Sequence, residues 1–340
     1  MPGNGLRARE RRRNLSKDVL EKRLEEYEDV FADAMDNLFL GGKGIVREDN
    51  LVPRPATAYT RRVDGSIRGG IRDIRMDNTQ GGKFRLICGI ENQSKIDNTM
   101  PVRVMGYEYA NYESQIKKIA DENRQEERDA GAAGIFNGQK LQPVMTGILY
   151  YGRADWKKPL RLYDMLEFPD GIEEEVKHMV VDYPIHVVQL ARLTEEERGR
   201  LKSDLRLVAE YLACEKEKDK WEKFLWDEEY EIRHLEELVD LLGEISRDRR
   251  YEVLLERIRK ENREKEAWRM CNIAEELEKI GVEKGIEQGM KKGMEKGVFA
   301  LVKDNLKQGV GRQEILEKLI YYFELSKERA DEYYNLVTAG

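Results

Sequence analysis

Apolar runs typical of β-strands occur only before Thr194 in this 340-residue chain, and beyond that residue the pattern is helical. A helix with apolar residues every three or four positions is expected over 16–40. A second helix should begin near Thr99, with Pro101 in its first turn. The best strand candidates are 70–76, 84–93, 144–151 and 185–193. This order predicts a mixed α/β domain followed by an α-helical extension.

The composition excludes several classes of protein. Charged residues make up 37% of the chain, so part of it must be solvated helix, and the net charge of -7 counts mildly against a nucleic-acid binder. The three cysteines and three histidines are scattered, which argues against a zinc site or a disulfide framework. No apolar run is long enough to cross a membrane and the N-terminus lacks a signal-peptide pattern, so we expect a cytoplasmic protein.

Shifts in composition along the chain predict five segments. They are a disordered basic tail over 1–14, an α/β domain over 15–200, a charged helical region over 201–265, a glycine-repeat helix over 266–300 and a small helical segment over 301–340.

The glycine repeat has two interpretations. Glycine recurs every fourth residue from Gly281 to Gly297, and the Glu and Lys residues in the gaps exclude a membrane span. Each glycine costs a helix roughly 1 kcal/mol relative to alanine, but the five lie near one face, where two helices can approach closely. The repeat is therefore either a surface for homo-oligomerisation through the C-terminal helices or a marginal, solvated linker.

Two acidic residues stand in strand-like apolar runs, where a charge is costly unless a cation or hydrogen bonds compensate it. They are Asp73 and Glu91. Residues two apart on a strand face the same side, so Glu91 and Gln93 should point together, and Asp73 joins them if the two strands are neighbours. Two converging carboxylates bind a hard cation such as Mg²⁺. The alternative is that Asp73 is a turn residue and Glu91 lies on a solvated face.

The chain also resembles the PD-(D/E)XK nuclease superfamily, in particular its transposase-like branch related to the Rpn recombination-promoting nucleases. The resemblance rests mainly on Asp73 and on the run Ile90-Glu91-Asn92-Gln93-Ser94 with Asp97. Further matching stretches are 31–33, 100–103 with Tyr107, 143–152, 162–166 and the glycine repeat. The resemblance implies a restriction-endonuclease-like core, with a mixed central sheet flanked by helices.

By this resemblance, Asp73 and Glu91 are ligands of Mg²⁺ or Mn²⁺, and the carbonyl of Asn92 completes the site. Gln93 stands where the superfamily usually has a lysine, so it can orient a water molecule through its amide but brings no positive charge. Lys95 is a candidate replacement for that charge, if the strand extends far enough to place it on the same face.

Three further residues are candidates for supporting roles. The first helix of such nucleases can add an acid to the site, and Asp33 is the candidate here. Arg103 and Tyr107 lie four residues apart on one helix face, from which they could contact phosphate or brace Glu91. A solvated face for Asp33 and a purely structural role for the other two remain open.

Positive charge clusters close to the predicted site. The arginines expected to contact the DNA backbone are Arg61, Arg62, Arg68, Arg72 and Arg75, and ordinary surface arginines are the alternative. We therefore expect a metal-dependent DNA endonuclease, which the resemblance links to recombination or mobile elements. The alternative is a catalytically weak or inactive DNA-binding or assembly protein that keeps the nuclease fold.

Overall fold

The computed structural model describes residues 17–55, 57–61, 67–71, 73–80, 83–126, 134–136, 138–171, 173–214, 217–227, 229–264 and 266–338. The chain divides into two compact units, Met1–Cys271 and Asn272–Gly340. Among the described residues, no helix combines the length and the apolar character needed to cross a lipid bilayer.

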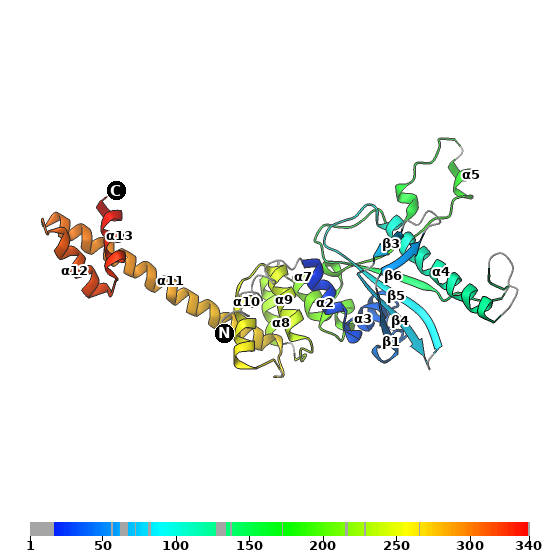
Figure 1. Ribbon diagram of the computed structural model, residues 1–340, viewed down its shortest axis with the longest axis horizontal. Helices are drawn as coiled ribbons and strands as arrows, with labels where there is room; N and C mark the ends of the chain where they lie inside the picture. The colour runs from blue at the N-terminus through cyan, green and yellow to red at the C-terminus, as the bar shows by residue number, and fades with distance from the viewer. Residues whose placement is uncertain are drawn as a thin grey trace. The chain divides into compact units, whose positions relative to one another are not determined.

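A five-stranded mixed sheet forms the centre of the first unit (Figure 1). In spatial order its strands are β1 (Leu51–Arg54), β4 (Ile74–Gln80), β5 (Lys83–Gln93), β6 (Val144–Tyr150) and β7 (His186–Gln189). The first three are antiparallel neighbours, whereas β5, β6 and β7 run parallel. The parallel pairing of β5 and β6 requires a crossover, which α4 (Met100–Gln125) supplies.

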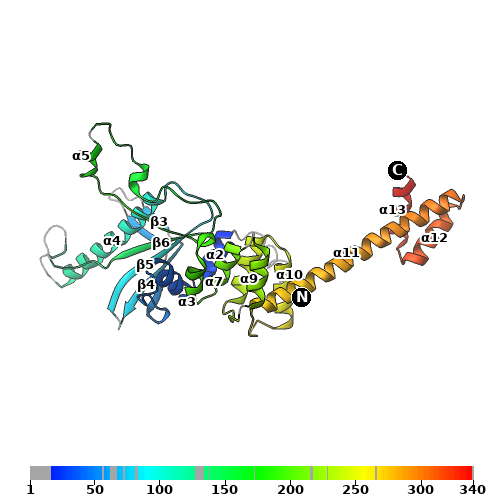
Figure 2. The same cartoon turned by 180° about the vertical axis from the view of Figure 1, so that it is seen from behind.

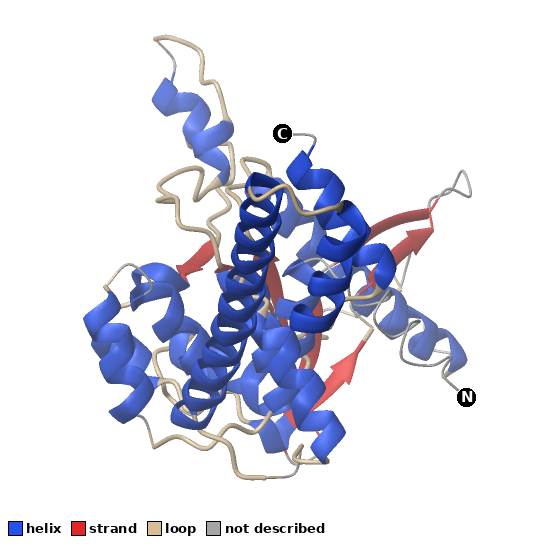
Figure 3. Ribbon diagram, turned by 90° about the vertical axis from the view of Figure 1, so that its left-hand side faces the viewer, coloured by secondary structure: helices blue, strands red, loops and turns tan. Residues whose placement is uncertain are grey.

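A separate antiparallel hairpin precedes β4 in the chain. It consists of β2 (Thr57–Arg61) and β3 (Ile67–Ile71). This hairpin and β6 pack against α4, whereas α2 (Lys17–Glu25) packs against β5 and α3 (Glu28–Asp33) against β1 (Figures 1 and 2). The mixed α/β domain predicted from the sequence is therefore present, with helices flanking the sheet (Figure 3).

The helix expected over 16–40 is broken into three segments. α2 and α3 are separate, and a π-helix (Ala34–Phe39) follows α3. The break lies at Tyr27, whose extended backbone (φ -76°, ψ 133°) lets its ring stack on His234 at 3.6 Å. That partner is more than 200 residues away, so the apolar spacing of the segment alone could not reveal the break.

Short elements connect the main ones. They are the 3-10 turns Glu48–Asn50, Leu162–Met165 and Leu190–Arg192, and α5 (Glu173–Lys177). The sheet is followed by a set of helices, as the sequence predicts: α6 (Glu195–Arg200), α7 (Leu205–Cys214), α8 (Lys218–Asp227), α9 (Leu235–Ser246) and α10 (Arg250–Glu261). These helices and the sheet belong to one compact unit.

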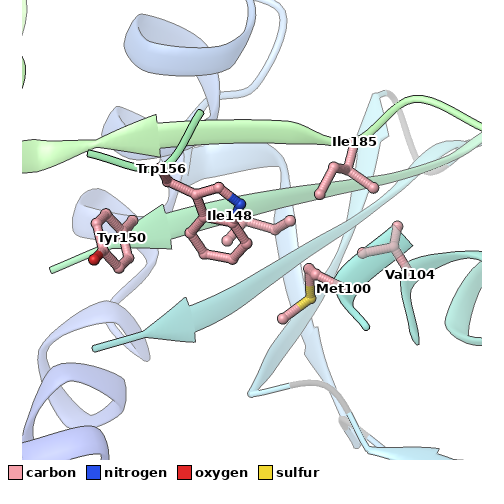
Figure 4. Packing of buried hydrophobic residues seen from close by; sticks show 6 residues of the cluster. All are labelled: Met100, Val104, Ile148, Tyr150, Trp156 and Ile185. Atoms are coloured by element: carbon pink, nitrogen blue, oxygen red, sulfur yellow. The ribbon is translucent and has the colours of Figure 1, made fainter. Parts of the chain in front are cut away.

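One hydrophobic cluster joins β6 to the start of α4 (Figure 4). It contains Met100, Val104, Ile148, Tyr150, Trp156 and Ile185. The Tyr150 and Trp156 rings meet edge to face at 5.2 Å. Because Met100 and Val104 lie on consecutive turns of α4, their burial fixes which face of that helix is turned towards the sheet.

The second unit has a small core of its own. Its helices are most of α11 (Met270–Lys307), then α12 (Arg312–Phe323) and α13 (Lys327–Thr338). The buried cluster is Val298, Val302, Ile315, Leu316, Leu319 and Ala330. The small helical segment expected over 301–340 consists of the last residues of α11 followed by α12 and α13, and the glycine repeat lies within α11, which continues to Lys307.

A chain that ends after Cys271 should keep the fold of the first unit, because the cut falls at the boundary between the two compact units. A cut after 265 should be far more damaging. It removes Trp268, which is 1% exposed and whose carbonyl accepts a hydrogen bond from the Ile232 N–H at 2.7 Å. Losing a buried tryptophan costs about 3 kcal/mol or more. Thermal melts would compare the two, and loss of cooperative unfolding after the first cut would contradict the prediction.

Candidate functional site

Asp73 and Glu91 lie opposite each other because of the register between β4 and β5. Ile74 pairs with Ile90 across this antiparallel ladder, so the residue before β4 faces the residue after Ile90. The backbone N–H of Asn92 donates to Asp73 Oδ2 at 2.8 Å and holds that carboxylate against the end of β5. The structure thus brings the two acids of the sequence prediction together.

Glu91 is buried, with 2% of its surface exposed, and its two oxygens have different surroundings. Oε1 accepts hydrogen bonds from Arg103 Nη2, from Gln93 Nε2 at 3.3 Å and from the Tyr107 hydroxyl at 3.4 Å. Oε2 is buried and has no hydrogen-bond partner among the described residues. A buried carboxylate oxygen without a partner is costly, and a bound cation would remove that cost.

The pKa of Glu91 reflects the same surroundings. Burial, and after it the nearby charge of Asp73, raise the pKa of this carboxyl from its ordinary 4.5 to about 7, against the opposing effects of Arg103 and Tyr107. Close to neutral pH the carboxyl is therefore about half protonated. Two carboxylates that repel each other in this way form a site whose charge a cation can neutralise.

The start of α4 holds the arginine that contacts Glu91. Arg103 Nη1 donates to Asp97 Oδ2 at 2.6 Å, and its Nε and Nη2 donate to the Tyr107 hydroxyl at 3.1 and 2.9 Å. Asp97 in turn accepts from the backbone N–H of Thr99 at 2.8 Å, beside the first turn of α4. Arg103 and Tyr107 both contact Glu91 Oε1, which is the geometry that bracing Glu91 requires.

Two buried acids of α2, which the sequence prediction missed, bond to the residues that alternate with Glu91 and Gln93 along the chain. Asn92 Nδ2 donates to Glu25 Oε2 at 2.6 Å, and the Tyr151 hydroxyl donates to Glu25 Oε1. Ser94 donates to Glu21 Oε1 at 3.3 Å. Burial holds the pKa of Glu25 well above its ordinary value, so this carboxyl is neutral over a wider range than a surface glutamate.

A weak signal for these acids was present in the sequence. Glu21 and Glu25 each follow a buried leucine, Leu20 and Leu24, and all four lie within two turns of α2. Acidic side chains beside an apolar stripe can be buried when the interior supplies a hydrogen-bond partner. That partner, Asn92, is 67 residues away from Glu25, so only the fold identifies the pair.

Asp33, the acid predicted to support the site, has other partners. Its Oδ2 accepts hydrogen bonds from the backbone N–H groups of Lys202 and Ser203 at 2.8 and 2.7 Å and from the Ser203 hydroxyl. Its Oδ1 accepts from Asn37 at 2.6 Å. Asp33 therefore anchors the turn before α7, and we leave it out of the proposed site.

Gln93 and Lys95 differ in their placement. Gln93 ends β5 on the face of Glu91, as the alternation of strand residues predicts. Lys95 lies in the bend after the strand and is exposed, because β5 stops at Gln93. The strand therefore does not extend far enough to place Lys95 on the same face as Glu91.

Most arginines expected to bind DNA cannot be placed. Arg62 and Arg72 lie outside the described residues, and for Arg61 on β2 and Arg68 on β3 only the backbone is described. Arg75 is described, and it donates to Asp77 Oδ1 at 3.1 Å. Asp77 is buried and also pairs with Arg54 at 2.8 Å, so Arg75 helps to neutralise a charge within the sheet.

The residues present suit a magnesium ion better than a transition metal. No group of three or more His, Cys, Asp or Glu side chains is arranged around one point within the described part of the chain. Magnesium usually takes only one or two carboxylates from the protein and keeps several waters. Asp73, Glu91 and a backbone carbonyl at the end of β5 fit that pattern.

Comparison with known protein families finds a model that matches part of this chain. The family model described as "Putative transposase, YhgA-like" matches residues 62–216, which is less than half of the chain but includes β4, β5, α4 and β6. No curated protein and no solved structure shows a detectable match to the chain. The segment that carries Asp73, Glu91 and Arg103 is thus similar to the YhgA-like transposase family.

Proposed function

We propose that this protein is a metal-dependent endonuclease that hydrolyses phosphodiester bonds in DNA, built on a PD-(D/E)XK-type core. The observation that carries the proposal is the pair of carboxylates formed by Asp73 and the buried Glu91, with one Glu91 oxygen lacking a hydrogen-bond partner among the described residues. The match to a transposase family supports a substrate that is DNA and a role connected with mobile elements.

Each residue of the site has a distinct role in this proposal. Asp73 and Glu91 bind Mg²⁺ or Mn²⁺, together with the carbonyl of Asn92. A bound divalent cation supplies positive charge to the phosphate and lowers the pKa of water. Gln93 orients the attacking water through its amide group. Arg103, held by Asp97 and Tyr107, keeps the Glu91 carboxylate in position.

A second candidate function is DNA binding without catalysis. Gln93 brings no positive charge to the place where lysine usually stabilises the transition state. In addition, the Arg103 guanidinium contacts Glu91 Oε1, so the acid already has a cationic partner. These two observations favour a weak or inactive enzyme that keeps the fold.

The decisive test is cleavage of supercoiled plasmid by the purified chain. With Mg²⁺ or Mn²⁺ we expect nicked and linear products, and EDTA should abolish them. Tight binding of DNA without cleavage under any divalent ion would move the assignment to the non-catalytic candidate. Failure to bind DNA at all would contradict both.

Salt dependence tests the arginine-rich hairpin separately. Each lost phosphate contact reduces the slope of log affinity against log salt concentration by about 0.9. Replacing Arg61 and Arg62 with glutamine should therefore flatten that slope by about 2 and weaken binding to all sequences alike. Fluorescence anisotropy at several salt concentrations measures this, with Lys118→Gln on α4 as a control, and an unchanged slope would place the DNA elsewhere.

A further inference from the structure

The Arg103 guanidinium stands beside the proposed metal site as a positive charge that belongs to the chain itself. Its Nη2 donates to Glu91 Oε1, so this oxygen of the carboxylate has a cationic partner. The other oxygen, Oε2, is buried and has no hydrogen-bond partner among the described residues. A metal ion that binds Oε2 therefore approaches a carboxylate whose charge an arginine already offsets in part.

Burial makes this arginine effective against a metal ion. Glu91 is 2% exposed, so little water screens the guanidinium from a cation at Oε2, and charges interact more strongly in such surroundings than in water. Burial, and after it Asp73, raise the pKa of Glu91, while Arg103 lowers it by stabilising the carboxylate. Arg103 thus supplies some of the positive charge that a metal ion would bring.

Arg103 has a second acidic partner nearer the surface. Its Nη1 donates to Asp97 Oδ2 at 2.6 Å. The side chains of Arg103 and Asp97 are 36% and 25% exposed, so the guanidinium joins a buried acid to an acid in contact with solvent. Rotamer changes of partly exposed side chains need no movement of the backbone. Arg103 can therefore leave Glu91 and keep an acidic partner while α4 stays in place.

We propose that Arg103 lowers the affinity of the Asp73–Glu91 site for a divalent metal ion until a DNA phosphate draws the guanidinium away from Glu91. Arginine binds phosphate through two parallel N–H groups, so a phosphate at the site offers it another anion. Glu91 then regains its full charge for the metal, and DNA and metal bind cooperatively. This inference rests on the proposed function, because it concerns the same two acids and the same substrate.

Magnesium binding to the full chain without DNA tests the competition. Isothermal titration calorimetry at about pH 9, above the Glu91 pKa of about 7, limits competition from protons. Arg103→Gln removes the positive charge and should bind Mg²⁺ at least about tenfold more tightly than wild type does. Unchanged or weaker binding by this variant would overturn the proposal.

Three further variants separate the charge of Arg103 from its packing. Arg103→Lys keeps the charge and should bind Mg²⁺ about as wild type does, so a gain equal to that of Arg103→Gln would overturn the proposal. Asp97→Asn leaves Glu91 as the acid that holds Arg103 and should weaken Mg²⁺ binding. Arg124→Gln is the matched control, since Arg124 pairs with Asp121 at 2.6 Å, roughly 30 Å further along α4. Tighter binding by this control would reduce the effect to a general loss of positive charge and overturn the proposal.

Fluorescence anisotropy tests the part that concerns DNA. The affinity for a phosphorothioate duplex, which resists cleavage, is measured in EDTA and in saturating Mg²⁺. Because linkage is reciprocal, the factor by which Mg²⁺ raises DNA affinity equals the factor by which DNA raises Mg²⁺ affinity. That factor should be at least about tenfold larger in wild type than in Arg103→Gln, which has no arginine to release. Equal factors would show that DNA does not act through Arg103 and would overturn the proposal.

The outcomes also distinguish this inference from the proposed function. Failure of wild type to cleave DNA would contradict the proposed function, while calorimetry would still decide whether Arg103 competes with Mg²⁺. Cleavage that depends on Glu91, together with equal Mg²⁺ affinity in wild type and Arg103→Gln, would keep the proposed function and overturn this inference.

Discussion

Replacing Glu91 with glutamine should lower the rate of DNA cleavage by about a thousandfold or more. The substitution keeps the size of the side chain but removes the buried carboxylate proposed to bind the metal. A metal ion contributes several kcal/mol to transition-state stabilisation, and each 1.4 kcal/mol or so corresponds to a factor of ten in rate. Single-turnover cleavage of a plasmid at saturating Mn²⁺ measures the loss.

Matched variants distinguish the loss of a metal ligand from a loss of folding in the sheet. Asp73→Asn should behave like Glu91→Gln, whereas Asp77→Asn removes another buried acid of β4 and should leave cleavage largely intact if the protein remains folded. Gln93→Lys restores the usual positive charge and should raise the rate. Cleavage by Glu91→Gln at the wild-type rate, in a preparation free of contaminating nuclease, would remove Glu91 from the site.

The same substitution should stabilise the metal-free protein at alkaline pH. The folded-state pKa of Glu91, about 7, lies above its ordinary 4.5, so the folded protein holds this proton more tightly than the unfolded chain does. Its contribution to stability is therefore greatest below pH 4.5 and is lost as the pH rises from about 4.5 to about 7. At 1.36 kcal/mol per pKa unit, the loss amounts to about 3 kcal/mol.

Glutamine stays neutral at every pH. The Glu91→Gln variant should therefore be as stable as wild type at pH 4.5 and more stable than wild type by about 3 kcal/mol at pH 8. The two proteins are compared by urea unfolding in EDTA at the same series of pH values. Because the other titratable groups are the same in both proteins, their contributions cancel in the difference between the two free energies of unfolding. Saturating Mg²⁺ should remove most of the difference, because it binds the ionised carboxylate. A difference that does not change with pH would contradict the raised pKa.

Local patterns in the sequence predicted the parts of the site that depend on neighbouring residues. Alternation along β5 placed Glu91 and Gln93 on one face, and a spacing of four on α4 placed Arg103 beside Tyr107. The approach of Asp73 to Glu91 required one further assumption, that their strands are adjacent. This holds because β4 and β5 pair as antiparallel neighbours, with Ile74 opposite Ile90.

Contacts between distant segments could not be predicted in this way. The contact of Glu25 with Asn92 and that of Asp33 with Ser203 join residues 67 and 170 positions apart. Both acids stand on the first helical segments with similar apolar neighbours, and nothing in their local patterns distinguishes them. Only the packing of those helices decides that Glu25 reaches the strand of the site while Asp33 reaches the turn before α7.

The pairing of β1 with β4 has a practical consequence for anyone who expresses part of this protein. A fragment cut to the limits of the family match, 62–216, begins after β1 and after α2. Its β4 would then be an open edge strand with unpaired backbone groups, which is a template for aggregation. The stretch recognisable by similarity is thus smaller than the piece of chain that can fold, and soluble material requires the residues that precede it.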